Sequence, residues 1–290
     1  MSRTKEPMTG TPRAKALGSA LRAARKDARL TLRALGDLVN IDHSKLSRFE
    51  TGERPPRAED VATILLAVGV SGERREEILE LSRGTDEPRW LGMGLPEQQR
   101  QLQALLDIER SATQITDVSP LLVPGLLQTS DYARSIMTRG GVPAEEIETR
   151  VMVRVGRRES LRQRTDPPKL TALVGEAALR QVIGGVQVMR TQLDFLVEVS
   201  AWPNVDLYVV PLMQDWHPGL GEPFVVVEFG KNGPPVVHLE TTASGLFLHE
   251  AIDVKPYQEA LPGILGAALS TAGSVELITE IATAHEQNRS

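Results

Sequence analysis

The sequence contains no cysteine, and this absence excludes several classes of site at once. Disulfide bonds, thiolate zinc sites and a cysteine nucleophile each require a thiol side chain. Aromatic residues are also scarce, at 4% of the chain. No stretch approaches the roughly 20 consecutive apolar residues that a membrane-spanning helix requires, and the N-terminus has no apolar signal segment. We therefore expect a cytoplasmic protein.

The remaining composition is that of an ordinary globular protein, with 41% hydrophobic and 24% charged residues. At 290 residues, the chain is long enough to predict two domains. The net charge of -5 is unevenly distributed. Residues 1–57 contain 13 Lys or Arg and 6 Asp or Glu, a net charge of +7, whereas 20 basic and 32 acidic residues give the remainder -12. This asymmetry predicts a basic module that binds a polyanion, joined to an acidic body with another task.

Apolar residues between 14 and 83 recur at helical spacing. Breaks at 29–31, 40–42, 52–56 and 69–72 divide this region into five short helices. A connection rich in Gly and Pro follows and marks a domain boundary. We predict four segments: a flexible basic tail at 1–13, an all-α helix-turn-helix domain at 14–83, a linker at 84–95 and a regulatory and dimerisation domain at 96–290.

The second domain has a mixed pattern. Helices are predicted at 96–112 and 145–164, and again in two segments that close the chain. Four short runs between 205 and 249 are rich in β-branched and aromatic residues, which is typical of strands, and Asn232-Gly233 between two of them indicates a hairpin. We expect an α+β domain with a small, mostly antiparallel sheet, and an α+β chain overall.

The stretch NIDHSKLSRFETGE, residues 40–53, has the features of a helix defined at both ends. Asp42 is placed to accept hydrogen bonds from the free N–H groups of the first turn, and its charge suits the helix dipole. Ile41 and Leu46 have the spacing of a hydrophobic staple. Gly52 supplies a stop, and Asn40 can adopt the left-handed conformation of a tight turn.

The two faces of this helix differ in chemistry. Leu46 and Phe49 share one face. The other face carries groups that can bond base edges or phosphates, namely His43, Ser44, Ser47 and Arg48. A preceding helix at 32–39 and a three-residue turn complete a helix-turn-helix, whose second helix would enter the major groove. The alternative is that this face is only the solvated side of a small helical bundle.

The longer stretch LGSALRAARKDARLTLRALGDLVNIDHSKLSRFETGERPPRAEDVATILLAVGV, residues 17–70, resembles the XRE, or lambda-repressor-like, helix-turn-helix domain. The resemblance implies that His43, Ser44 and Arg48 face bases, with Lys45 and Ser47 nearby. It also implies that Arg25 pairs with Glu50, which would tie the recognition helix to its support.

Two residues depart from the family pattern. Leu32 follows Thr31 where the family often has a phosphate-binding Gln, so that contact is missing or is made by a neighbour such as Arg33. Gly36 replaces the usual Ala, at a cost of about 1 kcal/mol unless close packing requires it. Phosphate contacts are predicted for residues on and between the first two helices, and Thr31 is included among the DNA-binding residues: Arg22, Lys26, Thr31 and Arg33.

The acidic half also resembles a known domain, through SPLLVPGLLQTSDYARSIM, GGVQVMRTQLDFLVEVSAWPNVDLYVVPL and HPGLGEPFVVVEF. Similar domains are attached to XRE domains in many actinobacterial regulators. These regulators are often encoded beside a small partner protein and are described as antitoxin-like or developmental regulators. The resemblance leaves the biochemical role of the domain open.

Few other groups in the acidic half indicate a site. Trp202, Tyr208, Trp216 and His217 cluster around one predicted strand, and could form a ligand or partner groove or simply pack. The arginine-rich run at 150–164 could bind an acidic partner or lie in solvent. His238 and Glu240 have the His-x-Glu spacing of a zinc deaminase, but the Cys pair which that chemistry needs is absent. No phosphate-binding loop or nucleophile elbow is present.

We therefore expect a nucleoid-associated transcriptional regulator that binds operator DNA as a homodimer, with no cofactor, no metal and no catalytic residues. An effector or a small partner protein would act through the acidic domain. The competing hypothesis is an antitoxin-like interaction module that binds a small protein and autoregulates its own operon. An enzyme with an appended DNA-binding domain is a third class, and His217, His238 and Glu240 would be its candidates.

Overall fold

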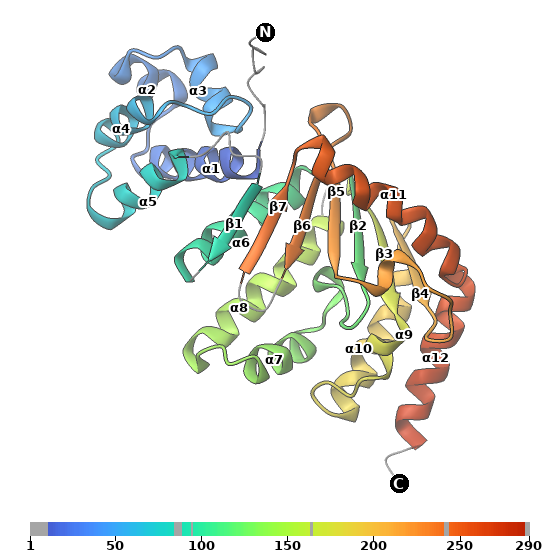
Figure 1. Ribbon diagram of the computed structural model, residues 1–290. Coiled ribbons are helices and arrows are strands. Elements are labelled where there is room, and N and C mark those ends of the chain that lie inside the picture. The colour runs from blue at the N-terminus through green and yellow to red at the C-terminus, as the bar shows by residue number, and fades with distance from the viewer. Residues whose placement is uncertain (1–10, 84–88, 94, 163–164, 241–243, 288–290) are drawn as a thin grey trace. The chain divides into compact units, whose positions relative to one another are not determined.

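The computed structural model describes residues 11–83, 89–93, 95–162, 165–240 and 244–287 (Figure 1). The chain divides into two compact units. Unit 1 comprises residues 1–111 with 231–236 and 240–251, and unit 2 comprises 112–230, 237–239 and 252–290. Most of the predicted basic tail, residues 1–10, lies outside the described residues.

Unit 1 begins with the five helices that the apolar spacing predicts. Their bounds are α1 (Pro12–Asp27), α2 (Leu32–Val39), α3 (His43–Glu50), α4 (Ala58–Ala67) and α5 (Gly72–Ser82). Helix α1 begins inside the predicted tail, because Thr11 Oγ1 accepts a hydrogen bond from Ala14 N at 3.0 Å and Pro12 suits the first helical position.

The core of these helices contains the expected apolar side chains. Leu17 and Leu21 of α1, Leu46 and Phe49 of α3 and Leu65 of α4 are each at most 2% exposed. Helix α1 packs against α3, α4 and α5, so it is the central support of the bundle. Leu38 of α2 is also an apolar residue of the helical pattern, but it is 62% exposed and does not belong to this core.

Unit 1 also contains three elements beyond the five-helix bundle: β1 (Arg89–Met93), α6 (Leu95–Ser111) and β7 (Ser244–Leu248). Strands β1 and β7 pair in antiparallel fashion, with Arg89 opposite Leu248 and Met93 opposite Ser244. Helix α6 packs against α1. A strand therefore lies within the predicted linker at 84–95, and the compact unit continues to residue 111, beyond the predicted boundary at 83.

Unit 2 is built on a mixed sheet. Its strands are β2 (Gln114–Ser119), β3 (Lys169–Gly175), β4 (Val205–Val210) and β5 (Phe224–Glu228), and β6 (Val236–Glu240) contributes residues to both units. Within unit 2 the order is β5-β2-β3-β4. Strand β2 pairs antiparallel with β5 but parallel with β3, and β3 is parallel with β4. The α+β class is confirmed, whereas these parallel pairs and the central strand β2 were not expected.

Helices pack around this sheet (Figure 1). The α-helices are α7 (Ser130–Arg139), α8 (Ala144–Arg157), α9 (Glu176–Arg180), α10 (Val186–Ser200), α11 (Ala251–Ala267) and α12 (Thr271–Gln287). The short 3₁₀ segments are η1 (Gly125–Leu127), η2 (Arg158–Leu161), η3 (Pro218–Leu220) and η4 (Gly230–Asn232). Helix α8 ends at Arg157 and continues as η2, where one helix was predicted through residue 164.

The edge strand β4 has backbone partners other than a strand. Val209 N donates to Ser274 Oγ at 2.8 Å, and Val209 O accepts from Leu269 N at 2.9 Å. Helix α12 and the residues before it thus satisfy an edge that could otherwise pair with another chain.

Among the described residues, no single helix has the length and apolar character needed to cross a membrane; α11 and α12, bent by 67°, pass that test only as a pair and only on length and composition.

Candidate nucleic-acid interface

The turn between α2 and α3 is tight, and two residues make it possible. Asn40 has a φ of 54°, in the left-handed region that Asn tolerates better than most residues. A Cβ on Gly36 would lie 2.6 Å from Ile41 O, a distance that real Cβ atoms essentially never show. Ile41 N donates to Gly36 O at 3.1 Å. Close packing therefore explains why this chain has Gly at position 36.

Asp42 caps the N-terminus of α3, as the sequence predicts. Its Oδ1 accepts from Ser44 N at 2.9 Å and also from Ser44 Oγ. These hydrogen bonds from Ser44 hold the pKa of the Asp42 carboxyl below its ordinary value. His43 Nδ1 lies 3.7 Å from Asp42 Oδ2. The first turn of α3 is thus held by one carboxylate.

A buried ion pair holds the C-terminal end of α3. Arg25 Nε donates to Glu50 Oε1 at 2.6 Å, and Arg25 Nη2 donates to Glu50 Oε2 at 2.8 Å. Both residues are 9% exposed, and Arg25 Nη1 also donates to Leu30 O at 2.7 Å. The pair that the XRE resemblance implied is confirmed, and its bidentate geometry fixes α3 against α1.

Two glycines let α1 approach α3 closely. A Cβ on Gly18 would lie 2.5 Å from Phe49 O and 2.8 Å from Glu50 O. Gly52 has a φ of +75°, and a Cβ there would lie 2.8 Å from the Cα of Lys15. The sequence did not predict this contact of Gly18, because a glycine inside a helical pattern does not show which backbone segment packs against it.

The side of α3 opposite the core is open. His43, Ser44 and Arg48 are exposed, and Ser47 is half-buried. Arg48 Nε donates to Ser44 O at 3.4 Å, so its side chain lies along the helix. Three of the four predicted outward residues therefore face solvent together from the first turns of one helix, with Ser47 beside them.

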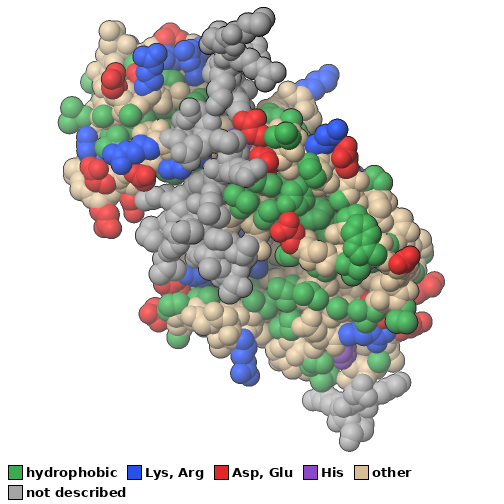
Figure 2. Space-filling view, in the orientation of Figure 1, with side chains coloured by type: hydrophobic (Ala, Val, Ile, Leu, Met, Phe, Trp, Pro, Cys, Tyr) green, Lys and Arg blue, Asp and Glu red, His purple; other side chains and the backbone are tan. Residues whose placement is uncertain are grey.

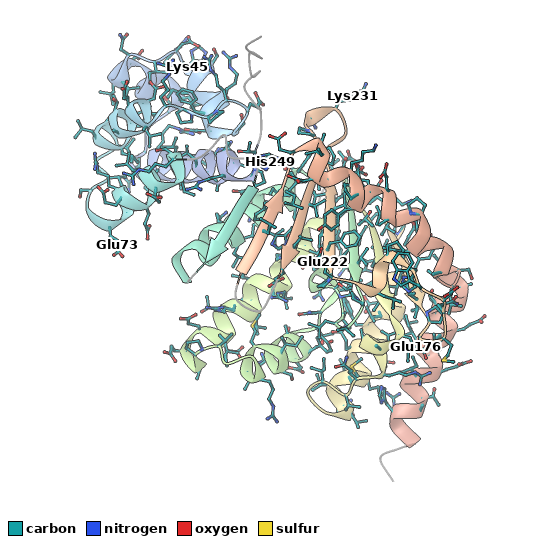
Figure 3. All side chains as sticks on the ribbon, in the orientation of Figure 1. Lys45, Glu73, Glu176, Glu222, Lys231 and His249 are labelled. Atoms are coloured by element: carbon teal, nitrogen blue, oxygen red, sulfur yellow. The ribbon has the colours of Figure 1, made fainter. Side chains whose placement is uncertain are left out.

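Lys45 has a different environment from its neighbours (Figure 3). Its Nζ lies 3.7 Å from Asp60 Oδ2 on α4 and 5.2 Å from the centre of the Phe49 ring. The ammonium therefore has an acidic and an aromatic neighbour inside the domain. This arrangement makes Lys45 a weaker candidate for a DNA contact than the resemblance implied.

The predicted phosphate-binding residues lie on α1, on α2 and at the N-terminus of α2. Lys26 and Arg33 are exposed, and the Arg22 side chain is 58% exposed with its Nε 3.8 Å from Glu50 Oε2. Thr31 Oγ1 accepts from Ala34 N at 3.1 Å and caps α2, so the role visible for Thr31 is structural. Figure 2 shows Lys and Arg side chains gathered over α2 and α3.

Two further arginines lie next to this surface and were not predicted. Arg54 and Arg57 are exposed in the connection between α3 and α4. Arg54 N donates to Arg48 O at 3.2 Å, which places this connection at the C-terminal end of α3. The sequence does contain a signal for them, because the run GERPPR at residues 52–57 places two arginines just after α3.

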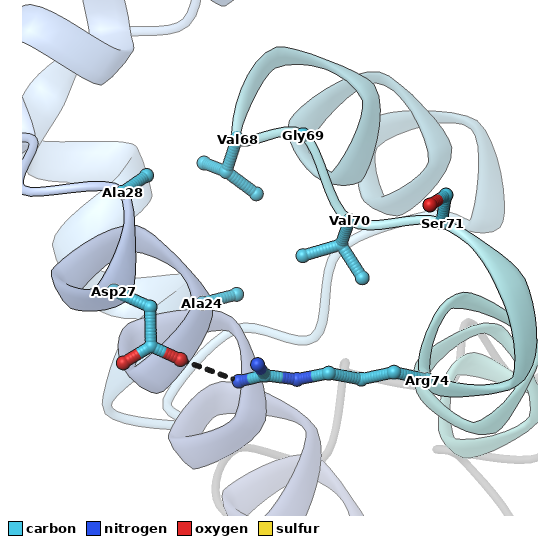
Figure 4. Close-up of a pocket in the computed structure, with 8 residues that line it drawn as sticks. All are labelled: Ala24, Asp27, Ala28, Val68, Gly69, Val70, Ser71 and Arg74. Carbon is cyan, nitrogen blue, oxygen red and sulfur yellow. Dashed lines mark hydrogen bonds and ion pairs between the residues drawn. The ribbon is translucent and has the colours of Figure 1, made fainter.

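The helix-turn-helix domain also has an open depression on another side (Figure 4). It is lined by the end of α1 and by the turn between α4 and α5, and Arg74 Nη2 donates to Asp27 Oδ2 at 2.8 Å across it. None of its lining residues comes from α2 or α3. The depression is therefore separate from the exposed face of α3.

The four aromatic and histidine residues predicted as a ligand site do not come together. Trp202 precedes β4 and packs against Phe195, with ring centres 6.3 Å apart, while Tyr208 lies half-buried within the strand. Trp216 and His217 follow the strand, and Trp216 is exposed whereas His217 is buried. Since β4 separates Trp202 from Trp216, these residues do not form one pocket.

The arginine-rich run at 150–164 lies on α8 and η2 of unit 2. Arg154 Nη1 donates to Gln128 Oε1 at 3.1 Å, and Arg158 stacks over the Phe195 ring at 4.5 Å from its centre. Arg150 pairs with Glu146. Part of this run is thus used in packing and local pairing rather than lying freely in solvent. In the part of the chain that the structure describes, no three His, Asp or Glu side chains form a group that could hold a metal ion.

Comparison with known proteins gave matches at both ends of the chain. Residues 16–78 match a family model described as a helix-turn-helix domain. Residues 102–280 match the family model of a domain of unknown function, DUF5753. Among solved structures, the chain is similar to the clp gene regulator ClgR from C. glutamicum, with 30% identity over 28% of this chain and 97% of that chain, at a TM-score of 0.22. No curated protein matches the chain.

Proposed function

The chain belongs to the DUF5753 family, named for a domain of unknown function, and on this premise we propose that it is a transcriptional regulator which recognises a specific operator. The matched helix-turn-helix domain supplies the DNA-binding part of the proposal. In this proposal the protein acts by binding DNA and does not catalyse a reaction.

The observation that carries the proposal is the division of α3 into two faces. Leu46 and Phe49 are each 1% exposed, whereas His43, Ser44 and Arg48 face solvent. The major groove admits one helix whose exposed side chains read donors and acceptors on the bases. Because α3 is held rigidly at both ends, these side chains would meet the bases without an ordering step in the helix itself.

The contacts of the three exposed residues suggest different roles. Arg48 is the residue suited to bidentate recognition of guanine. Ser44 already donates its hydroxyl proton to Asp42, so its remaining lone pairs would accept from amino groups of adenine or cytosine. His43, at the first position of α3, would contact a base edge from the end of the helix.

The residues around α3 would bind the phosphate backbone. Arg22 and Lys26 are exposed on α1 and Arg33 is exposed on α2, while Arg54 and Arg57 follow the recognition helix. Phosphate contacts supply most of the non-specific affinity and set the register of the protein on the duplex. In this proposal the XRE-type contact that Leu32 cannot make is replaced by Arg33.

The acidic domain would regulate this activity and pair two copies of the chain. A two-fold dimer would place its two recognition helices about one helical turn of DNA apart, on a pseudo-palindromic site. An effector or partner protein that favours one arrangement of the dimer would change operator affinity.

The test begins with selection of bound sequences from random duplex DNA, which yields the operator of the wild-type chain. Arg48→Ala should then weaken binding to this operator by about 1–3 kcal/mol and remove the preference at one base pair per half-site. Affinity for every single-base variant of the operator measures both effects. Arg75→Ala on α5, with a side chain 38% exposed, is the matched control and should leave affinity unchanged.

Two results would count against the proposal. Failure to enrich any sequence would exclude sequence-specific recognition. A uniform loss of affinity for all operator variants on Arg48→Ala would show that Arg48 binds phosphate rather than a base.

One observation favours a second function. Unit 2 carries six arginines and no lysine within residues 150–164, although residues 58–290 are acidic overall, and arginine is the residue suited to carboxylate recognition. An antitoxin-like module would use this surface to hold a small acidic partner protein. Purification of the chain with a stoichiometric partner, which is released by substitution of the exposed Arg162 with Ala and which alters DNA affinity, would favour this function over the first.

A further inference from the structure

Arg29, in the turn that joins α1 to α2, has a backbone conformation that long side chains rarely adopt. Its φ is 57°, in the left-handed region. In the part of the chain that the structure describes, Arg29 and Asn40 are the non-glycine residues with a positive φ. Asn tolerates this region because its short polar side chain can bond locally, whereas arginine has no such compensation. The folded chain therefore holds Arg29 under a strain that glycine would not incur.

This strain arises from the way in which α1 ends. Arg29 N donates to Lys26 O at 2.8 Å. The next amide group, Leu30 N, donates to Arg25 O at 3.1 Å. Together these two hydrogen bonds form a Schellman motif, in which the residue at the position of Arg29 is left-handed and is usually glycine. Helix α4 ends with the same pair of hydrogen bonds, and there the residue is Gly69, with a φ of 73°.

The side chain of Arg29 is not used inside the folded chain. It is exposed, and among the described residues it makes no hydrogen bond or ion pair. The nearest acidic residue in the sequence, Asp27, is instead bonded to Arg74 at 2.8 Å. Arg29 is also not one of the residues that line the depression in Figure 4. No side-chain partner within the described ranges thus offsets the strain of the turn.

The end of α1 offers Arg29 one interaction of a weaker kind. The negative end of a helix dipole attracts basic side chains, and Arg29 follows that end of α1. Arg25 and Lys26 already occupy the last turn of this helix, and salt screens the attraction at an exposed position. If this attraction alone explained Arg29, a glycine here would make the folded chain less stable. The sign of that change can be measured.

The surroundings of Arg29 are basic and are tied to the recognition helix. Lys26 precedes it in the last turn of α1, Arg33 follows it in the first turn of α2, and both are exposed. Leu30 O, the carbonyl group after Arg29, accepts a 2.7 Å hydrogen bond from Arg25, which also holds the end of α3. Exposed positive charge gathered in this way is the electrostatic footprint of a protein that binds a polyanion.

We propose that Arg29 contacts a phosphate group of the DNA, and that this contact offsets the strain of the left-handed turn. A guanidinium carries its donors in a planar fork that matches the geometry of phosphate oxygens. Such a contact would position the protein on the duplex without reading its sequence. This role of Arg29 rests on the DNA-binding function proposed above, whereas the strain of the turn does not require DNA.

Arg29→Gly tests both statements, because it relieves the strain and removes the charge together. Calorimetry of the full chain should show a rise of about 2–4 °C in the unfolding midpoint of the helix-turn-helix domain. Fluorescence anisotropy should show an affinity for DNA that is about eightfold lower at 0.1 M salt, with about 0.9 lost from the slope of log affinity against log salt concentration. The loss should be the same for the selected operator and for unrelated duplexes.

Two variants serve as matched controls. Arg29→Lys keeps a positive charge in the same strained turn, so it should retain the salt slope and show no rise in the unfolding midpoint. Arg75→Ala removes one positive charge from α5, where the side chain is 38% exposed, and should retain both the affinity and the slope.

Three results would overturn the role of Arg29: an unchanged salt slope in Arg29→Gly, an equal loss of slope in Arg75→Ala, or an unfolding midpoint that stays or falls in Arg29→Gly. The proposed function can fail separately. A wild type that selects no sequence, but loses slope in Arg29→Gly, retains the phosphate contact and rejects the sequence-specific regulator. A wild type that selects an operator and keeps its slope in Arg29→Gly retains the regulator and rejects the contact. A wild type that binds no duplex rejects both.

Discussion

Arg25 and Glu50 are the residues whose pairing decides how α3 is presented. Two parallel hydrogen bonds join them, and both side chains are almost fully buried. A buried pair is not in itself evidence of high stability, because removing two charges from water costs about as much as their attraction returns. Its effect here is specificity of position: only one orientation of α3 satisfies both partners at once.

Removing one partner should therefore be more harmful than removing both. Arg25→Ala is expected to lower the free energy of unfolding by about 3–5 kcal/mol, because the Glu50 carboxylate is left buried without its partner. The double variant Arg25→Met/Glu50→Leu should lose less free energy of unfolding than Arg25→Ala, because no buried charge is left without its partner. Urea denaturation of the full chain, monitored for each variant, measures these differences. Equal losses in the single and double variants would show that the pair contributes only through packing volume.

Lys15 is a second charge removed from water, in this case half-buried, and it predicts a pH dependence. Burial lowers the pKa of Lys15 to about 8, although the nearby Asp107 on α6 acts in the opposite direction. Its ordinary pKa is 10.5, so between pH 8 and 10.5 the unfolded chain binds more protons than the folded chain. The folded state is consequently stabilised as the pH rises through this window.

Comparison with Lys15→Met isolates this effect. The stability of the wild type should rise relative to Lys15→Met between pH 8 and 10.5, by up to about 3 kcal/mol. Differential scanning calorimetry of both proteins at several pH values measures the change. A difference in stability between the wild type and Lys15→Met that stays constant from pH 8 to 10.5 would contradict the lowered pKa of Lys15.

At the scale of elements, the turn between α2 and α3 depends on a backbone approach that only glycine permits. Gly36 faces Ile41 O so closely that an added Cβ would lie 2.6 Å away. Helix propensity alone would favour Ala at this position by up to about 1 kcal/mol. Packing therefore overrides propensity at the point where the helix-turn-helix bends.

Two glycine substitutions test this statement. Gly36→Ala should destabilise the chain and weaken DNA binding, because Ile41 and the start of α3 must move. Gly156→Ala, in α8, should instead stabilise by about 0.5–1 kcal/mol, because an added Cβ there meets nothing within 4 Å. Thermal unfolding of both variants gives the sign of each change. Stabilisation by Gly36→Ala would show that the turn can relax at little cost.

Elements differ in how well their sequence patterns predicted them. The five helices of 12–82 were predictable because each buries an apolar face with helical spacing. Strand β2 was not, because its core positions include Asp117, which is 6% exposed and accepts from Ser119 Oγ at 2.6 Å. A charged side chain in a central strand hides the apolar pattern. Strand β1 was missed because its Gly92 and flanking prolines are typical of a linker.

At the scale of the whole molecule, charge is divided between a basic DNA-binding segment and an acidic remainder. Residues 1–57 carry +7, and residues 58–290 carry -12. A protein that neutralises phosphates releases counterions, so its affinity for DNA falls as salt rises. The net charge of -5 therefore does not oppose DNA binding.

This division predicts a salt dependence that one residue can change. Arg33→Ala should reduce the slope of log affinity against log salt concentration by about 0.9, the loss of one phosphate contact, without altering base preference. Arg190→Ala in unit 2 removes the same charge and should leave the slope unchanged. Fluorescence anisotropy titrations at several salt concentrations measure both slopes. An equal change in the two variants would indicate a general charge effect.

The sequence by itself determined the helix-turn-helix and the outward face of α3. Helical spacing, the Asp42 cap and the Asn40 turn are local, so neighbouring residues suffice to specify them. Tertiary structure alone decided which backbone atoms surround Gly18, and that Lys45 approaches Asp60. These features depend on contacts between residues distant in the chain, which local spacing cannot encode. The exposure of Leu212 and Leu220, between β4 and β5, is likewise a property of the folded chain, since leucine is a residue type that is usually buried.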